Sequence, residues 1–480
     1  MSGKSSNIYS VSVAISAAGS ADADSNLLPQ IPANPAAGAE ATINQFAGMA
    51  TTRASVEAFT AGSEAFHQED HGGMTAGAQI PSPIGVVNTT GSEKFNAPVD
   101  TFIRAFYTDD VSVSHRFRTA AGGDPLKYGF GRILSTSMGL HDPGNASPTS
   151  IAASENAVGA DGDTFIVSDS DAGFLKIGAP VRRRKTNAIA HEYAVVTSMS
   201  SDGTDTTVKV HPRWTSQVMQ GDAIELCYAF YPVIGAANAK SLDCFVKFSM
   251  GGSGTDASVE RVACLARCSG FSISQDNLGA SLTMSVKPGV VVTNDGASAE
   301  TVATAEPPGK LAQMRYGARV DLAANHTGAA AGGVSLARTE KANFDWSCDV
   351  EFDIAPSSPS TTGILRSTAA EVNDARCTVS LTTEADTDLQ RMLVGEERRT
   401  LILGMGPSST SGGQGAAFIL LNGGRADGES NPVAGDEGRI QQTTQLMAIQ
   451  ESGIANLTGV AAGDLALAKA PFMLVLPKKA

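Results

Sequence analysis

The sequence predicts a mainly β protein with two β-sandwich domains, each with a flanking helix, and a small inserted β-barrel. Many short runs alternate apolar and polar residues, which is typical of half-buried strands. Small residues are abundant, with 50 glycines in 480 residues, and they suit short strands and turns better than long helices. The order of strands, one helix and more strands occurs twice, which indicates an internal duplication.

Residues 1–100 are expected to form an N-terminal arm, irregular apart from a first strand. The alternation from Ile8 to Ile15 is typical of a strand, and serines interrupt the apolar core that a signal peptide needs. The stretch 17–95 is rich in Ala, Gly, Pro and Ser, as in loops and extended arms. Within it, residues 51–66 are a candidate helix.

Residues 101–157 and 233–300 are predicted to form the first sandwich domain. Its helix is expected over 124–134, with Asp124 as N-cap and Pro125 at the first helical position, where its missing N–H costs nothing. The predicted strands of this domain cover residues 101–106, 111–117, 241–248, 259–265, 270–274 and 280–286.

Residues 158–232, between the two parts of that domain, are predicted to be a self-contained insert. Five candidate strands cover residues 164–167, 175–181, 193–197, 206–210 and 223–226. Five short strands in so little chain indicate a closed or nearly closed barrel, because closure removes exposed sheet edges. As a complete unit, the insert is expected to project from the molecule and to be replaceable by a short linker.

Residues 301–480 are predicted to form the second sandwich domain, reached through a linker over 294–308. A helix is expected over 385–395, with Gly395 closing it. The predicted strands of this domain cover residues 344–354, 376–382, 400–404, 417–421 and 472–476.

The net charge of −14 argues against a nucleic-acid-binding surface, which needs an excess of Lys and Arg. The six cysteines form no C-x-x-C pair and are expected to be reduced. Cys264 and Cys268 resemble half of a metal site, but no second Cys/His pair follows at ligand spacing.

No catalytic, cofactor-binding or metal-binding residues are assigned, and the chain is expected not to be an enzyme. GGSGTD at 251–256 lacks the second glycine of a nucleophile elbow. GMGPSSTSGG at 404–413 does not match a dinucleotide-binding loop. Both are interpreted as turns.

Two clusters have a functional and a structural interpretation. His67, Glu69, Asp70 and His71 could share a metal ion, but their Gly-rich context favours a solvated polar loop. The basic run 182–185, Arg-Arg-Arg-Lys, could contact phosphate. The acidic net charge favours instead a solvated turn, or salt bridges to an acidic neighbour in the same assembly.

The stretch 239–289, AKSLDCFVKFSMGGSGTDASVERVACLARCSGFSISQDNLGASLTMSVKPG, resembles a passage of the tail tube proteins (major tail proteins) of long-tailed bacteriophages. The predicted helix at 124–134 resembles the helix that precedes it in that family. In the second half, CDVEFDI, CTVSLTTEADTDLQRMLVGEERRTLIL and GAAFILLNGG resemble a second copy of the tube domain. The resemblance covers about two thirds of the chain and rests on the order and pattern of the strands.

The resemblance implies a virion structural protein made in the host bacterial cytoplasm and located in the tail. Such subunits join their sheets into rings that stack helically around a bore for DNA ejection. Two tube domains per chain imply homotrimeric rings with pseudo-sixfold symmetry, although hexameric rings stay open. The implied partners are the chain itself, other tail proteins and DNA passing through the lumen without specific binding. No membrane, cofactor or metal is implied.

A DNA-conducting bore is expected to carry more carboxylates than Lys and Arg, because cations would hold the duplex. The alternatives are another virion structural protein (capsid, decoration or fibre) and a secreted carbohydrate-binding β-sandwich protein. The last would need aromatic platforms, but aromatic residues make up only 6% of the chain.

Overall fold

The prediction of a mainly β protein is confirmed by a computed structural model, in which antiparallel strands dominate. The structure describes residues 9–17, 47–49, 64–68, 104–108, 111–116, 125–144, 147–157, 162–184, 192–214, 216–233, 242–250, 259–264, 266–276, 279–287, 290–295, 318–321, 334–335, 339–355, 366–384, 399–405, 415–425, 433–434, 440–448 and 451–478.

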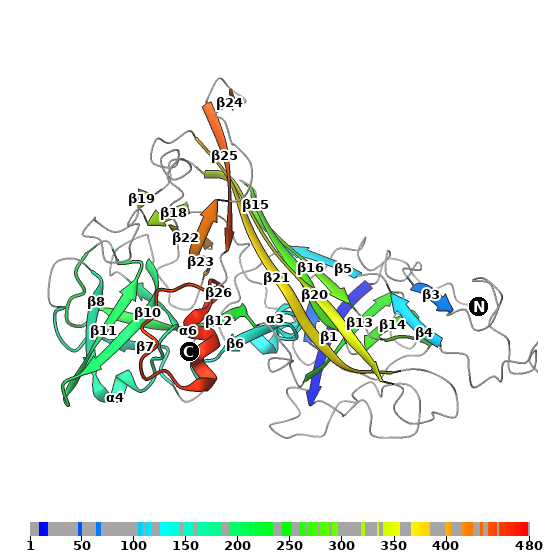
Figure 1. Cartoon of the computed structure of the whole chain (residues 1–480), viewed down its shortest axis with the longest axis horizontal. Helices are drawn as coiled ribbons and strands as arrows, with labels where there is room; N and C mark the ends of the chain where they lie inside the picture. The colour runs from blue at the N-terminus through cyan, green and yellow to red at the C-terminus, as the bar shows by residue number, and fades with distance from the viewer. Residues whose placement is uncertain are drawn as a thin grey trace, which may run out of the picture.

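Six antiparallel strands form the centre of the molecule, and together we call them the long sheet (Figure 1). Its longest members, β20 and β21, pair along most of their length and alternate buried and exposed residues where their side chains are described. In spatial order the strands are β5 (Val111–Arg116), β16 (Gly279–Lys287), β15 (Arg267–Asp276), β20 (Thr339–Ala355), β21 (Arg366–Glu384) and β25 (Ile440–Ala448).

The sheet continues beyond β25 into strands whose apolar residues share a core with the long sheet. β25 pairs with the end of β23, and β23 then pairs with β22 on one side and β26 on the other. Phe271, Phe344 and Trp346 from the long sheet belong to the same buried cluster as Phe418 and Phe472. These further strands are β22 (Arg399–Met405), β23 (Ala416–Arg425) and β26 (Phe472–Pro477), with β18 (Ala318–Asp321), β19 (Val334–Ser335) and β24 (Val433–Ala434) at the margins.

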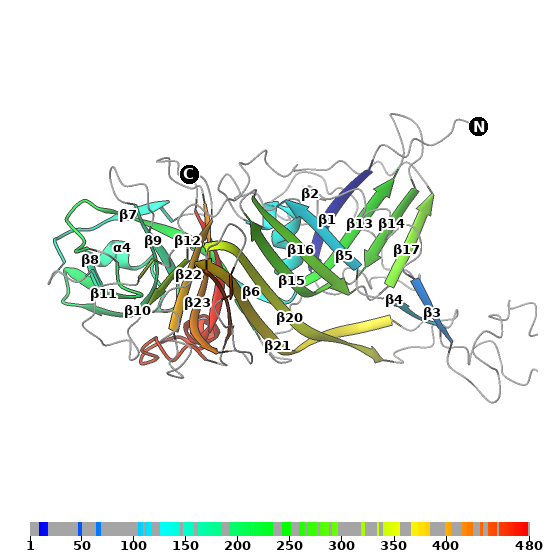
Figure 2. The same cartoon turned by 90° about the horizontal axis from the view of Figure 1, so that it is seen from above.

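A second sheet contains the first strand predicted from the sequence, β1 (Tyr9–Ala17), in the order β17-β14-β13-β1-β2. Figure 2 shows this sheet at one end of the molecule. The other members are β2 (Ala47–Met49), β13 (Leu242–Met250), β14 (Val259–Cys264) and β17 (Val290–Asp295). β17 therefore takes up the first two residues of the predicted linker at 294–308.

A short helical segment links β1 to the long sheet. The predicted helix 124–134 is present as a 3-10 turn, η3 (Pro125–Lys127), followed by α3 (Gly129–Leu134). The N-cap of α3 is Tyr128 and not Asp124. Buried Arg132 donates from Nη1 to the carbonyl of Val13 on β1 at 2.8 Å. The backbone N–H of Cys268 on β15 donates to Thr136 Oγ1 at 2.9 Å, so the segment is bonded to both sheets.

Four of the five strands predicted for residues 158–232 are present near their predicted places, whereas the predicted strand 175–181 begins only at Pro180 and continues to Arg184. The insert also includes residues before and after that range. Its ladder runs β8-β11-β10-β9-β12-β7, and a bridge between Glu155 and Ile166 returns from β8 to the residues after β7. Phe165, Val208 and Trp214 belong to its own buried core. The strands are β7 (Ser150–Ala152), β8 (Thr164–Ser168), β9 (Pro180–Arg184), β10 (Glu192–Ser201), β11 (Asp205–His211) and β12 (Ala223–Pro232), with a helical turn α4 (Asp169–Ala172).

The insert is bonded to the rest of the protein through β12, and this contact argues against the expectation that a linker could replace it. β12 was predicted to end at Leu226, but it continues to Pro232 and pairs there with β26 and with β6 (Met138–His141). A separate buried cluster joins Tyr193 and Val195 of the insert to Ile419 and Met473. Deleting the insert would expose this apolar surface and remove one side of the β26 pairing.

The remaining predictions have mixed outcomes. Residues 64–66 of the candidate helix at 51–66 are strand, within β3 (Glu64–Gln68), which pairs with β4 (Arg104–Thr108). The rest of that candidate, residues 51–63, and the predicted helix at 385–395 lie outside the described residues. Before β26 the chain forms η6 (Ala462–Asp464) and α6 (Leu465–Lys469), which had no counterpart among the predicted elements.

Candidate functional site

The outward side of the long sheet carries almost only polar side chains, and we call it the polar face. Alternation along each strand places apolar residues in the core and the intervening residues on this side. Met447 on β25, 43% exposed, is the one large apolar exception among the described residues. The polar face comprises Ser281, Thr283, Ser285 and Lys287 of β16; Ser272 and Ser274 of β15; Lys341, Asn343, Asp345, Ser347 and Asp349 of β20; Asp374, Arg376, Thr378, Ser380, Thr382 and Glu384 of β21; and Gln441, Thr443 and Gln445 of β25.

The strand register aligns these residues in rows that cross the sheet. One row joins Thr283, Ser272, Asp345 and Thr378, each directly opposite the next on its neighbouring strand. The adjacent row joins Ser281, Ser274, Asn343, Ser380 and Gln445. Directly opposed side chains are about 5 Å apart at Cβ, so each row forms a continuous band of hydrogen-bonding groups.

Hydrogen bonds within the polar face connect side chains of neighbouring strands and side chains along β20. Ser272 Oγ donates to Asn343 Oδ1 at 3.3 Å, and Asn343 Nδ2 donates to Asp345 Oδ2 at 2.6 Å. The hydroxyls of Thr382 and Thr443 lie 3.2 Å apart across β21 and β25. These bonds hold side chains in place while leaving further donors and acceptors for water.

The charges of the polar-face side chains that the structure describes nearly balance. Its described side chains include three cations, Lys287, Lys341 and Arg376. It carries four carboxylates, which are those of Asp345, Asp349, Asp374 and Glu384. Lys287 also donates to the carbonyl of Val350 at 2.9 Å. Among these described side chains carboxylates exceed cations by one, and hydroxyl groups predominate. The expected excess of carboxylates along a bore stays a prediction.

The basic run at 182–185 is neither a phosphate site nor a solvated turn at its first two residues. Arg182 on β9 is fully buried and paired with Glu225 on β12, and its Nη1 lies 3.3 Å from the Tyr193 hydroxyl. Burial raises the pKa of Tyr193 to about 12. Burial opposes the charge of Arg182, but Tyr193 and Glu225 raise the pKa of its guanidinium above the usual value. Arg182 therefore forms a salt bridge, but its partner Glu225 belongs to the same chain and not to a neighbour in an assembly.

Arg183 is also buried and satisfied within the insert. Its guanidinium donates to Asp222 Oδ2 from Nε at 3.1 Å and to the carbonyls of Ser216 and Gln217 at 2.7 and 2.8 Å. Its guanidinium carbon lies 5.9 Å from the centroid of the Trp214 ring. These contacts stabilise the insert, so Arg183 has no guanidinium face open to a ligand.

The other candidate motifs do not converge on a site. His67 lies in β3, while Glu69, Asp70 and His71 lie outside the described residues, as do 251–256 and 406–413. Cys227, Cys268, Cys348 and Cys377 are buried free thiols. Among the described residues, no three His, Cys, Asp or Glu side chains gather as metal ligands would. No helix in the same ranges has the length and apolar character needed to cross a membrane.

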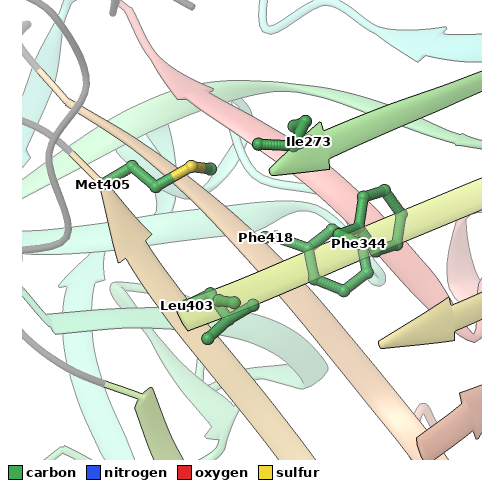
Figure 3. A pocket seen from close by; sticks show the side chains of 6 residues that line it. Ile273, Phe344, Leu403, Met405 and Phe418 are labelled. Atoms are coloured by element: carbon green, nitrogen blue, oxygen red, sulfur yellow. The ribbon is translucent and has the colours of Figure 1, made fainter. Parts of the chain in front are cut away.

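A small cavity of about 10 Å³ lies in the core, shown in Figure 3. Its lining is entirely apolar, so it offers no group to orient a polar ligand, and its volume is at the lower limit for one water molecule. The lining residues are Ile273, Ala342, Phe344, Leu403, Met405 and Phe418. The polar face is therefore the strongest candidate for function.

Comparison with known proteins gives no identification: no protein-family model matches the sequence, and no curated protein sequence matches it. The polar face was predictable in part, because the alternation of β15, β16, β20 and β21 is visible in the sequence. The contribution of β25 was missed. Its stretch Ile-Gln-Gln-Thr-Thr-Gln lacks the period of two that marks a strand.

Proposed function

We propose that this chain is a structural subunit of a bacteriophage tail tube, and that its polar face lines the bore through which DNA is ejected. The observation that carries the proposal is a broad antiparallel sheet with one polar, hydroxyl-rich side and one side packed on the core. The resemblance of residues 239–289 to tail tube proteins supports it, because these residues include β13, β14, β15 and β16. The function is structural and not enzymatic.

Assembly would proceed through the edges of the long sheet. Within the described ranges, β5 pairs with β16 on one side only, and an unpaired strand edge can accept a strand of another chain. We propose two sandwich-like tube domains per chain, homotrimeric rings with pseudo-sixfold symmetry, and helical stacking of the rings. Other tail proteins would bind the ends of the stack, and the protein would reside in the virion tail.

We further propose that the insert is a small closed barrel on the outside of the tube. The bridge between Glu155 and Ile166 and the separate core around Trp214 support closure. Figures 1 and 2 place the insert strands at the end of the molecule opposite the β17-β14-β13-β1-β2 sheet.

The test is the assembly state of purified protein. Negative-stain microscopy should show rings or tubes, and mass measurement of isolated rings should give three chains. A cysteine-directed label placed by Thr378→Cys on the polar face should lie inside the tube, whereas one placed by Asp202→Cys on the insert should lie outside. Closed shells, fibres, or a monomer that does not polymerise would reject the proposal.

A further inference from the structure

Three polar side chains are buried at one end of the long sheet's inner face. Thr383 on β21 and Gln442 and Thr444 on β25 have no exposed surface. Four of their atoms lack a hydrogen-bond partner: the two threonine hydroxyls and both the nitrogen and the oxygen of the Gln442 carboxamide. Buried polar groups are nearly always hydrogen-bonded, so such a concentration requires an explanation.

The strand register brings the three side chains together. Thr383 lies directly opposite Gln442, and Thr444 is two residues further along the same face of β25, opposite Leu381. Beyond them the same face is apolar, with Val379 directly opposite Leu446. The polar atoms thus form one group at the margin of an apolar core, and they are not scattered through it.

The free-energy cost of leaving these buried polar atoms without hydrogen bonds argues that a small molecule or ion binds them. Each buried donor or acceptor without a partner costs about 1–3 kcal/mol, so four would cost an amount comparable with the whole stability of a typical domain. A metal ion does not fit, because hard cations require several oxygen ligands with carboxylates among them, and the group offers two hydroxyls and one neutral amide. Water both donates and accepts, and buried water typically makes about three hydrogen bonds.

We propose that Thr383, Gln442 and Thr444 form an internal hydration site that holds ordered water between β21 and β25. The site does not by itself fix the register of β25, because a one-residue slip would place Gln441 and Thr443 where Gln442 and Thr444 now lie. The observed register instead keeps Leu446 opposite Val379 in the apolar core.

The first test replaces each buried hydroxyl by a methyl group of the same shape. Thr383→Val and Thr444→Val should each lower the folding equilibrium constant about tenfold, because the water loses a partner while the other polar groups stay buried. The matched controls are Thr382→Val and Thr443→Val, the neighbouring residues on the polar face, which should change it less than about threefold. If the two buried variants are as stable as wild type or more stable, the site is dry and the proposal is overturned.

The second test needs no variant. A high-resolution crystal structure of the wild-type protein should show a water molecule within about 3.2 Å of at least three of the four atoms. Direct hydrogen bonds among the three side chains with no water between them would overturn the proposal, as would an empty space. Neither outcome bears on the tail tube proposal, which is tested by assembly.

Discussion

Replacing Glu225 by Gln should destabilise the insert and the long sheet together. The change removes the negative charge that faces Arg182, whose side chain is fully buried. Removing one partner of a buried ion pair costs about 3–5 kcal/mol, since the remaining charge is left without compensation. Gln keeps the shape and a hydrogen-bond acceptor, so we expect a loss of about 3 kcal/mol in the free energy of unfolding.

The two tryptophans allow this loss to be measured in each core separately. Trp214 lies in the core of the insert, and Trp346 lies in the core beneath the long sheet. Trp346→Phe and Trp214→Phe each leave one fluorescent reporter, and Glu225→Gln is compared with its parent in both backgrounds by urea unfolding. Because β12 pairs both with β9 of the insert and with β26, whose apolar residues share the core around Trp346, both reporters should show the same loss.

The matched control is Glu451→Gln, which breaks the exposed ion pair with Lys469 at 3.0 Å. Exposed pairs contribute about 0–1 kcal/mol, so this variant should differ little from its parent. A loss seen by Trp214 alone would show that the insert unfolds independently and would restore the view of it as an appendage. Equal small losses in Glu225→Gln and Glu451→Gln would refute the reasoning about the buried pair.

Two further predictions concern the contacts of the C-terminal segment. Gly178 and Gly203 both have positive φ, but a Cβ at Gly178 would lie 2.5 Å from Ala468 Cα, whereas Gly203 faces open space. Thermal unfolding should therefore show a larger loss for Gly178→Ala than the roughly 1 kcal/mol expected for Gly203→Ala; equal losses would show that the contact with α6 yields easily. The pKa of His141 is lowered from 6.5 to about 4, mainly by the burial of its side chain and secondarily by the nearby charge of Lys176. Between these two pH values the unfolded state binds a proton that the folded state does not. As pH falls from 7 to 4, the free energy of unfolding of wild type should therefore fall by up to about 3 kcal/mol more than that of His141→Gln. Urea unfolding that shows the same pH dependence for both proteins would contradict this.

The strands with strict alternation could be predicted from the sequence, and two other kinds of strand could not. β20 and β21 alternate apolar and polar residues, so their presence and the side that each presents to the core were both predictable. The prediction of β12 ended too early, at Leu226, because residues 226–230 are buried on both faces of the strand and therefore show no alternation. β25 was not predicted for the opposite reason, because polar residues occupy both of its faces. Alternation of apolar and polar residues identifies only strands with one face exposed to solvent and the other packed on the core.

The candidate site was predictable to the same extent as its strands. The polar residues of β15, β16, β20 and β21 follow directly from alternation, but the pairing of strands far apart in the sequence does not. Arg182 illustrates the limit: its partner Glu225 is 43 residues away, and only the adjacency of β9 and β12 brings them together. A basic run in a sequence therefore gives no indication of whether its charges are solvated or neutralised inside the fold.

The polar face changes the electrostatic part of the tube proposal. Among its described side chains there are three cations and four carboxylates, so hydroxyl and amide groups predominate over charges there. DNA affinity depends on clustered Lys and Arg that displace counterions from phosphates. A wall of hydroxyl and amide groups provides no such cluster, and water can satisfy those groups as the duplex moves past. If this face lines the bore, passage requires no repulsion by carboxylates. The condition is that cations stay few and dispersed, as Lys287, Lys341 and Arg376 are on three different strands.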